Sequence, residues 1–301
     1  MISKQLFAQI LMLVLFAGVS LAQQTISQQA QQYFSDQDWE NAMKAYEKVV
    51  ATEPENGRAW LSLGLSYHNL KEYAQAIPAF QKADDLGFAQ PQARFHAARS
   101  LARLGKLDDS FNWLEKANAA GFGQLSRLDA NPDLEILRSD ARFAEIKKGT
   151  DRNARPCEYN SDCRAFDFWI GEWEVFNPNG QKVGENIIEK SLNGCMLLEN
   201  WTSSGGGDGK SMNYWDPAAK KWRQLWVDGT GGHMAYEGVF QDGALHFEGY
   251  QIQGNGAKSL FKMIFTPQEN GDVRQYIEQS LDEGKTFNVW FDGMYKKKAM
   301  Q

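Results

Sequence analysis

The chain has 301 residues, of which 43% are hydrophobic and 13% aromatic, and this length and composition predict two folded domains rather than a disordered chain. Its 32 basic and 38 acidic residues give a formal charge of −6 at pH 7 without any basic block, which argues against a nucleic-acid-binding protein. Beyond the extreme N-terminus, no apolar stretch reaches the ~18 residues typical of a membrane-spanning helix, so we expect no stable membrane span in the mature chain.

The N-terminus has the pattern of an export signal. Lys4 supplies a positive charge, an apolar run extends over 6–19, and Ser20-Leu21-Ala22 provides a small-residue cleavage site. A membrane anchor is the alternative, although the apolar run is short for a span. We predict that residues 1–22 are a signal peptide and that the mature chain is periplasmic or secreted.

Residues 23–124 contain a sequence repeat with a period of about 34 residues. The central copy has aromatic and small residues at regular positions: Trp60, Leu63, Gly64, Tyr67, Ala76, Phe80 and Ala83. This pattern resembles the tetratricopeptide repeat, a pair of antiparallel helices, and weaker copies on either side imply three repeats. One such pair cannot bury its own apolar face, so the repeats are expected to stack.

A capping segment is predicted over 125–148, because the last repeat needs a cover. Asn131-Pro132 has the pattern of an N-cap followed by proline in the first helical position, and Asp140 is a second candidate cap.

Resemblance to tetratricopeptide arrays implies a concave groove that binds a protein or peptide. The alternative is that the repeats support or dimerise the second domain. Chaperone-tail capture is not implied, because positions that carry Lys or Asn in the carboxylate-clamp subset hold other residues here, such as Leu61 and Leu65. The candidate partner-binding residues are Arg58, Leu61, Leu65, His68, Asn69, Arg99 and Arg103.

Residues 149–164 are polar, lack periodicity and are expected to form a linker. An exported chain meets conditions that permit disulfides, and three cysteines leave at least one unpaired in a monomer. We favour Cys157–Cys195 over Cys157–Cys163, because a hairpin of the first two strands returns Cys195 close to the start of the first. The cysteine spacing does not fit a zinc site, so no metal is predicted.

From residue 165 to 298, strand-like runs alternate with turn clusters such as Asn177-Pro178-Asn179-Gly180 and Asp282-Glu283-Gly284. With a break at Asn193-Gly194, the runs predict about ten strands in a barrel or sandwich. The aromatic stretch Phe166–Phe176 is expected to be the first strand.

The opening Phe166-Asp167-Phe168-Trp169-x-Gly171-x-Trp173, with Glu199-x-Trp201 and Trp222-x-Gln224-x-Trp226, resembles a bacterial family of secreted or cytosolic β-barrel proteins of unknown function. The resemblance covers 164–296 and implies a calycin-like barrel related to the fatty-acid-binding and nitrobindin types, without an established activity. The expected fold class is therefore a two-domain chain, an all-α tetratricopeptide superhelix followed by an all-β antiparallel calycin-like barrel of about ten strands.

Alternate residues of a strand share a face, so aromatic and polar side chains are expected to line up inside the barrel. Aromatic walls with a few convergent polar groups are typical of a small-molecule pocket. The alternative is a filled interior whose polar residues satisfy one another. The candidate ligand-binding residues are Glu199, Trp201, Asn213, Gln224, Trp226 and either Arg274 or Gln275, which lie on opposite faces of one strand.

Catalytic signals are few, because His233 and His246 accompany no recognisable Ser or Cys nucleophile. We predict no catalytic residue and no cofactor; a haem is discounted because no His follows His246. The predicted function is non-catalytic, with a helical groove for a protein or peptide and a barrel for a small, partly apolar ligand. The alternatives are a barrel enzyme that acts on a small lipid-like or carbonyl substrate through Glu199 with Arg274 or His233, and a purely structural envelope adaptor.

Overall fold

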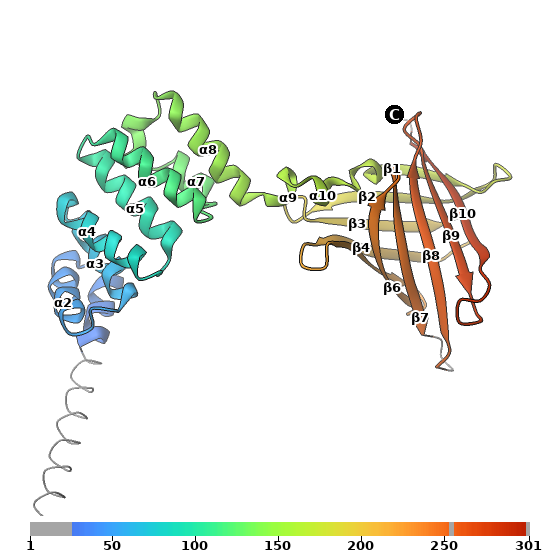
Figure 1. Cartoon of the computed structure of the whole chain (residues 1–301), viewed down its shortest axis with the longest axis horizontal. Coiled ribbons are helices and arrows are strands. Elements are labelled where there is room, and N and C mark those ends of the chain that lie inside the picture. The colour runs from blue at the N-terminus through green and yellow to red at the C-terminus, as the bar shows by residue number, and fades with distance from the viewer. Residues whose placement is uncertain (1–25, 253–255, 299–301) are drawn as a thin grey trace, which may run out of the picture. The chain divides into compact units, whose positions relative to one another are not determined.

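The structure is a computed structural model that describes residues 26–252 and 256–298; the predicted signal peptide lies outside these residues. The chain divides into two compact units after Ala154. The first unit is helical and the second is a closed β-barrel (Figure 1). The expected fold class is confirmed.

The helical unit consists of helices that pack in successive pairs (Figure 1). Three pairs match the three predicted repeats: residues 26–35 with α2 (Trp39–Thr52), α3 (Gly57–Asn69) with α4 (Tyr73–Asp85), and α5 (Gln90–Arg103) with α6 (Leu107–Ala119).

Small residues allow the helices of a pair to approach closely. Ala42, Ala76 and Ala98 are fully buried, and a Cβ atom on Gly64 of α3 would lie 2.6 Å from the ring of Phe80 on α4. These are the positions at which the repeat pattern has its small residues, so the close packing of the pairs follows from the sequence.

A capping segment covers the last repeat. It comprises α7 (Leu125–Asp129), the 3-10 helix η1 (Pro132–Leu137) and α8 (Ala141–Ala154), and the Asn131 side chain accepts a hydrogen bond from the Asp133 N–H at the start of η1. The following side chains of this segment are buried against Phe95 and Phe111 of the repeat: Leu128, Leu134, Leu137, Phe143 and Ile146.

The predicted linker over 149–164 is helical instead. Helix α8 continues to Ala154, and the short helices α9 (Pro156–Tyr159) and α10 (Ser161–Arg164) follow. Polar residues hold α8 in place: Thr150 Oγ1 donates to Asn118 Oδ1 at 2.8 Å, and Asn153 Nδ2 donates to the Phe122 carbonyl at 3.1 Å. The polar residues Thr150 and Asn153 of this stretch therefore form hydrogen bonds within the helical unit.

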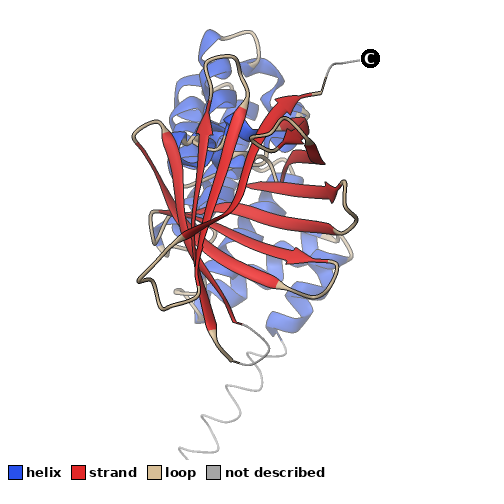
Figure 2. Cartoon of the chain, turned by 90° about the vertical axis from the view of Figure 1, so that its right-hand side faces the viewer, coloured by secondary structure: helices blue, strands red, loops and turns tan. Residues whose placement is uncertain are grey.

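Ten antiparallel strands form the closed barrel, in which each strand pairs with its neighbours in sequence and β1 pairs with β10 (Figure 2). The strands are β1 (Gly171–Phe176), β2 (Lys182–Ser191), β3 (Met196–Ser203), β4 (Asp208–Asp216), β5 (Lys221–Asp228), β6 (His233–Gln241), β7 (Ala244–Ile252), β8 (Lys258–Pro267), β9 (Val273–Ser280) and β10 (Asn288–Lys297).

The expectation that Phe166 begins the first strand is wrong. Residues Asp167–Trp169 form the 3-10 helix η2, and the strand begins at Gly171, whose φ of +141° suits glycine better than other residues. A three-residue period places Phe166 and Trp169 on one side, where their rings stack at 4.7 Å. Both side chains are fully buried and fill one end of the barrel interior.

No helix among residues 26–252 and 256–298 combines the length and the hydropathy required to span a bilayer.

Candidate functional site

The barrel interior changes from apolar to polar along its length. Around Phe166 and Trp169 it is filled by fully or almost fully buried apolar side chains, including Trp222 of β5 and Phe265 of β8. Further along these strands lies a belt of buried polar side chains: Asn186, Glu199, Ser211, Asn213, Gln224 and Gln275. Beyond this belt the interior is not filled.

A cavity of about 350 Å³ lies next to the polar belt. Its lining is mostly aromatic and aliphatic, with a few polar groups, which is the composition of a small-molecule site. The lining residues are Val183, Glu199, Trp201, Ser203, Gln224, Trp226, Met234, Tyr236, Met263, Gln275, Ile277, Trp290, Phe291 and Tyr295.

Two glycines make room for the indole rings of the cavity wall. A Cβ atom on Gly209 of β4 would lie 2.1 Å from the ring of Trp226 on β5, and one on Gly184 of β2 would lie 2.5 Å from the ring of Trp201 on β3. Each ring therefore occupies the space that the side chain of a larger residue at these two positions would need.

Glu199 is the buried carboxyl of the cavity, with 3% of its surface exposed. Ser211 Oγ donates to its Oε2 at 2.5 Å, and Asn186 Nδ2 donates to its Oε1 at 2.7 Å. Burial raises the pKa of Glu199 to about 7, although these two hydrogen bonds favour the ionised form.

Hydrogen bonds extend from Glu199 in two directions along the belt. On one side Asn213 Nδ2 donates to Ser211 Oγ at 2.8 Å, and Gln224 Nε2 donates to Asn213 Oδ1 at 2.7 Å. On the other side Asn186 Nδ2 also lies 3.3 Å from the Tyr295 hydroxyl, which donates to Gln275 Oε1 at 2.7 Å. The side chains of this network therefore restrain one another around the carboxyl.

The two tyrosines nearest the carboxyl stay neutral. Burial first, and then the charge of Glu199, raise the pKa of Tyr236 on β6 and of Tyr295 on β10 well above the usual value. Glu199 is therefore the group of this network that titrates near neutral pH.

The structure brings most of the predicted ligand-binding residues together. Glu199, Trp201, Gln224, Trp226 and Gln275 line the cavity. Asn213 is fully buried behind it and reaches it through Gln224.

Arg274 is the exception. It lies on the outer face of β9, where its guanidinium is 2.8 Å from Asp292 of β10 and 46% of its side-chain surface is exposed. Since strand residues alternate between faces, the inward position of Gln275 requires an outward Arg274.

Sequence reasoning did not select Asn186, Tyr236 and Tyr295 as site residues, although all three belong to the network or the cavity wall. For Tyr295 a signal was present, because it ends the run Phe291-Asp292-Gly293-x-Tyr295.

The residue combination expected for a barrel enzyme is not assembled. His233 is exposed at the start of β6, and neither it nor Arg274 lines the cavity that contains Glu199. In the parts of the chain that the structure describes, no three His, Cys, Asp or Glu side chains gather in a way that could hold a metal ion.

In the helical unit, three predicted partner-binding residues meet at one point. His68 of α3 lies with Arg99 and Arg103 of α5 around the carboxylate of Asp133, which belongs to η1 of the capping segment. Arg99 Nη2 is 2.7 Å, His68 Nε2 3.0 Å and Arg103 Nε 3.7 Å from this carboxylate. We call these four residues the Asp133 cluster.

The Asp133 cluster is partly buried, and the arginines beside Asp133 compensate the charge of its carboxylate. Burial alone raises the pKa of Asp133, but the hydrogen bonds from His68 and Arg99 outweigh it and lower the pKa to about 2. The expectation that His68 has a groove or surface side chain is corrected, because only 5% of it is exposed and its Nδ1 lies 2.8 Å from Ser100 Oγ.

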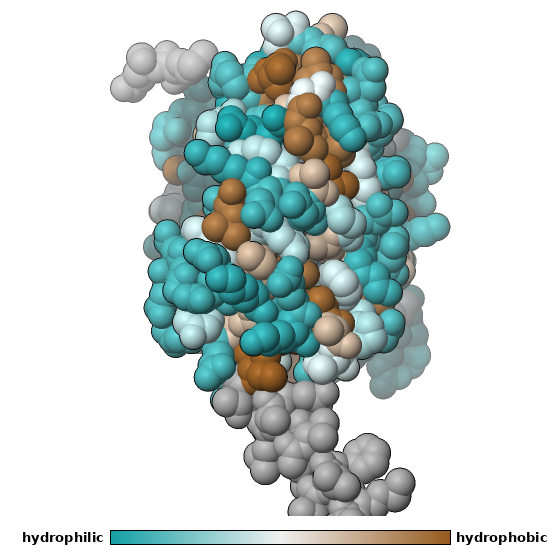
Figure 3. Space-filling model, turned by 90° about the vertical axis from the view of Figure 1, so that its left-hand side faces the viewer, coloured by the Kyte–Doolittle hydropathy of each residue, from teal (hydrophilic) through white to brown (hydrophobic). Residues whose placement is uncertain are grey.

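The remaining candidate groove residues are not among the charged partners of Asp133. Arg58 and Asn69 are exposed, whereas Leu61 and Leu65 are partly buried against the core that contains Phe80. Figure 3 shows one face of the helical unit, on which hydrophobic residues form separate patches within a mostly hydrophilic surface.

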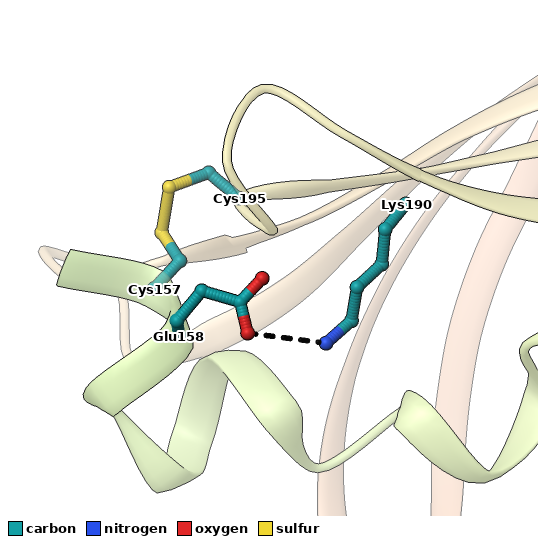
Figure 4. The surroundings of a disulfide bond; sticks show 4 residues. All are labelled: Cys157, Glu158, Lys190 and Cys195. Atoms are coloured by element: carbon teal, nitrogen blue, oxygen red, sulfur yellow. Dashed lines mark ion pairs between the residues drawn. A yellow bond between two sulfur atoms is a disulfide. The ribbon is translucent and has the colours of Figure 1, made fainter. Parts of the chain in front are cut away.

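A disulfide joins Cys157 of α9 to Cys195, which follows β2 (Figure 4). Next to it, Glu158 lies 3.5 Å from Lys190 of β2, and Lys190 Nζ also lies 2.9 Å from Asp167 Oδ2. These contacts fasten the segment before the barrel to the barrel wall. The third cysteine, Cys163, is free and buried.

Comparison with known proteins gives a family match and a curated relative. Residues 35–117 match the family described as anaphase-promoting complex, cyclosome, subunit 3. Protein unc-45 homolog B from Xenopus laevis is 22% identical over 197 residues, which are 60% of this chain and 21% of that protein. The chain thus spans about a fifth of the length of this curated relative. Together with the three helix pairs, these matches identify the N-terminal part as a tetratricopeptide-like repeat region.

Two solved structures each match 43% of the chain. The type III secretion translocator chaperone SycD from Yersinia enterocolitica is 19% identical, with 43% of this chain and 90% of that chain covered and a TM-score of 0.31. PcrH in complex with the chaperone-binding region of PopD is 22% identical, with 43% and 91% covered and a TM-score of 0.33.

Proposed function

We propose that this is a periplasmic or secreted, non-catalytic protein, in which the helical unit binds a protein or peptide and the barrel holds a small, partly apolar molecule. The observation that carries the barrel half is the cavity of about 350 Å³ with its aromatic wall and buried polar belt. The mostly apolar lining and the small number of polar groups suit a ligand with one polar end.

A tetratricopeptide-like helical unit fits protein binding, and the match of residues 35–117 to a repeat-family model supports this half of the proposal. In this chain we assign partner binding to Arg58, Leu61, Leu65 and Asn69, because the capping segment already occupies His68, Arg99 and Arg103. A Leu65→Glu variant is expected to lose partner binding, whereas the same change at the exposed Leu104 is a matched control.

Export is supported by the signal-like N-terminus and by the Cys157–Cys195 disulfide, which persists in oxidising compartments. We also propose that the barrel belongs to the bacterial family with the Phe166-Asp167-Phe168-Trp169 opening. Fractionation of the native host, with thiol labelling before and after reduction, tests the compartment and the disulfide together.

Native mass spectrometry of protein exported to an oxidising compartment and purified without detergent tests the barrel half. We expect a retained molecule of low mass in the full chain, and its loss in a Gly209→Leu variant that drives the new side chain into the space of Trp226. An unliganded mass for the full chain, together with failure of aromatic and aliphatic probes to bind, would contradict the container function.

A barrel enzyme is the second candidate, and one observation favours it. Glu199, with its pKa raised to about 7 inside a cavity, is suited to accept and return a proton at neutral pH. This candidate requires turnover of a lipid-like or carbonyl compound that a Glu199→Gln variant abolishes while the variant still binds the compound.

A further inference from the structure

The charge of the barrel cavity is unusual for a container of fatty acids or other anions. Among the residues that line it there is no lysine, arginine or histidine, and Glu199 is the one acidic side chain. A ligand carboxylate or phosphate placed in this cavity would therefore meet a like charge and no compensating one.

Within the described residues, Glu199 takes part in no ion pair. Its two hydrogen-bond donors, Ser211 and Asn186, are neutral side chains from β4 and β2. The titratable groups that face it are Tyr236 from β6 and Tyr295 from β10, both of which are neutral at physiological pH. A buried carboxylate without a cation is costly, and this cost falls when a cation is brought beside it.

The other half of the cavity suits the body of such a cation. The tryptophan and phenylalanine side chains in the cavity lining come from three strands: Trp201 of β3, Trp226 of β5, and Trp290 and Phe291 of β10. Aromatic faces attract organic cations as well as apolar groups, and this attraction strengthens when the pair is shielded from water.

We propose that the barrel binds a small organic amine in its protonated form, with the ammonium group beside Glu199 and an apolar body against the tryptophans. This inference rests on the proposed container function and specifies the class of ligand. No covalent step is involved, and binding requires only that Glu199 is ionised and the amine protonated.

The same geometry predicts how binding depends on pH. Because burial raises the pKa of Glu199 to about 7, the carboxyl is mostly ionised above that pH and mostly protonated below it. An amine with a pKa well above this range stays protonated throughout. Its affinity is therefore expected to fall about tenfold for each pH unit below ~7 and to level off above it.

Isothermal titration calorimetry with three probes tests the ligand class: phenethylamine, phenethyl alcohol and phenylacetate. They share an aromatic body and differ in the charge of the polar end. With the full-length mature chain at about pH 8, we expect the amine to bind at least ~10-fold more tightly than the alcohol, and phenylacetate to bind most weakly.

Two variants separate the role of Glu199 from a general effect on folding. Glu199→Gln is expected to lose about tenfold or more in amine affinity and to lose the pH dependence, while alcohol binding changes little. Glu248→Gln, on an exposed position of β7, is the matched control and should behave as the wild type. If Glu199→Gln does not fold, Ser211→Ala, which keeps the carboxyl, is used to test whether the amine preference and its pH dependence persist.

The outcomes distinguish this inference from the container function. If the alcohol or phenylacetate binds as tightly as the amine, or if the Glu199→Gln variant keeps the pH dependence, the amine assignment is wrong and the container function stands. If no probe binds but exported protein retains a neutral or anionic molecule, the amine assignment is again overturned. If neither a probe nor a retained molecule is found, both the assignment and the container function fail.

Discussion

The helical unit and the barrel each hold an acidic side chain away from water, and they compensate it differently. In the helical unit Asp133 is surrounded by His68, Arg99 and Arg103 of the same chain, and its pKa is lowered to about 2. In the barrel Glu199 receives neutral donors only, and burial raises its pKa to about 7. The first carboxylate has its counter-charge within the fold, whereas the second lies beside a cavity without one.

This difference indicates which of the two carboxylates is able to bind a cation from outside the chain. A carboxylate whose counter-charge already lies beside it in the same chain contributes to the folded state. A carboxyl that is hydrogen-bonded but lacks a cation gains from the arrival of one. We therefore expect perturbations of the Asp133 cluster to change stability alone and perturbations of the Glu199 region to change binding as well as stability, and the following experiments examine that difference.

The largest expected effect is on the filled end of the barrel. Trp169→Ala removes a fully buried ring that packs on Phe166 and Phe265, so we expect the barrel to lose about 4 kcal/mol of unfolding free energy. Urea unfolding followed by near-UV circular dichroism measures this loss. Tyr214→Ala, at a side chain that is 45% exposed, is the control and should cost much less. Equal losses in the two variants would mean that the η2 segment does not fill the interior.

Removal of the disulfide is expected to rank next. Cys157 and Cys195 are 38 residues apart, and a cross-link over such a loop restricts the unfolded chain by roughly 3–4 kcal/mol. The double change Cys157→Ser with Cys195→Ser should lower the urea midpoint of the barrel and leave the helical transition in place. A shift of the helical transition instead would contradict the assignment of α9 to the barrel unit.

Glu199 should make barrel stability depend on pH in the direction opposite to an ordinary ion-paired acid. Burial raises its pKa from the ordinary value of 4.5 to about 7 in the folded state, so the folded state binds the proton more tightly than the unfolded chain. Stability is then highest below ~4.5 and decreases as the pH rises through ~7, by roughly 3 kcal/mol for this group. Glu199→Gln should remove this component, as measured by thermal unfolding across the range; an unchanged profile would argue against a buried, titrating Glu199.

The Asp133 cluster is expected to give the smallest of these changes. Asp133→Asn removes the charge that Arg99 and Arg103 share, at an expected loss of roughly 1.5–3 kcal/mol in the helical unit. The folded-state pKa is lowered below the ordinary 3.8, so this contribution is present above ~4 and is lost as the pH falls through ~2. Helical circular dichroism on heating measures the loss, and Asp109→Asn on the exposed first turn of α6 is the control. An unchanged barrel transition is expected in both variants.

The periodic parts of the fold were predictable because they repeat simple rules. The three helix pairs follow from small and aromatic residues about 34 positions apart, and the ten strands follow from turn clusters around alternating runs. By contrast, Phe166–Trp169 has the composition of a strand and the three-residue spacing of a 3-10 helix, and composition alone favoured the strand.

The site was predictable only in part, because alternation defines two faces without saying which one points inward. On β9 both faces mix polar and apolar side chains, so the sequence does not tell whether Arg274 or Gln275 points into the barrel. The pairing of β9 within the closed barrel decides this. The contact of Asp133 with His68 joins residues 65 positions apart through a 3-10 helix, and no local pattern in the sequence specifies it.

An acidic residue of any protein that approaches this part of the helical unit has to compete with Asp133 for the cationic side chains of the Asp133 cluster. Asp133 belongs to the same molecule as the cationic side chains, so it competes for them at an effective concentration of roughly the millimolar range. This effective concentration does not depend on the concentration of the partner protein. A single acidic residue on a partner gains nothing by exchanging with Asp133. If the helical unit binds a partner as proposed, a partner that engages these cations has to make additional contacts elsewhere.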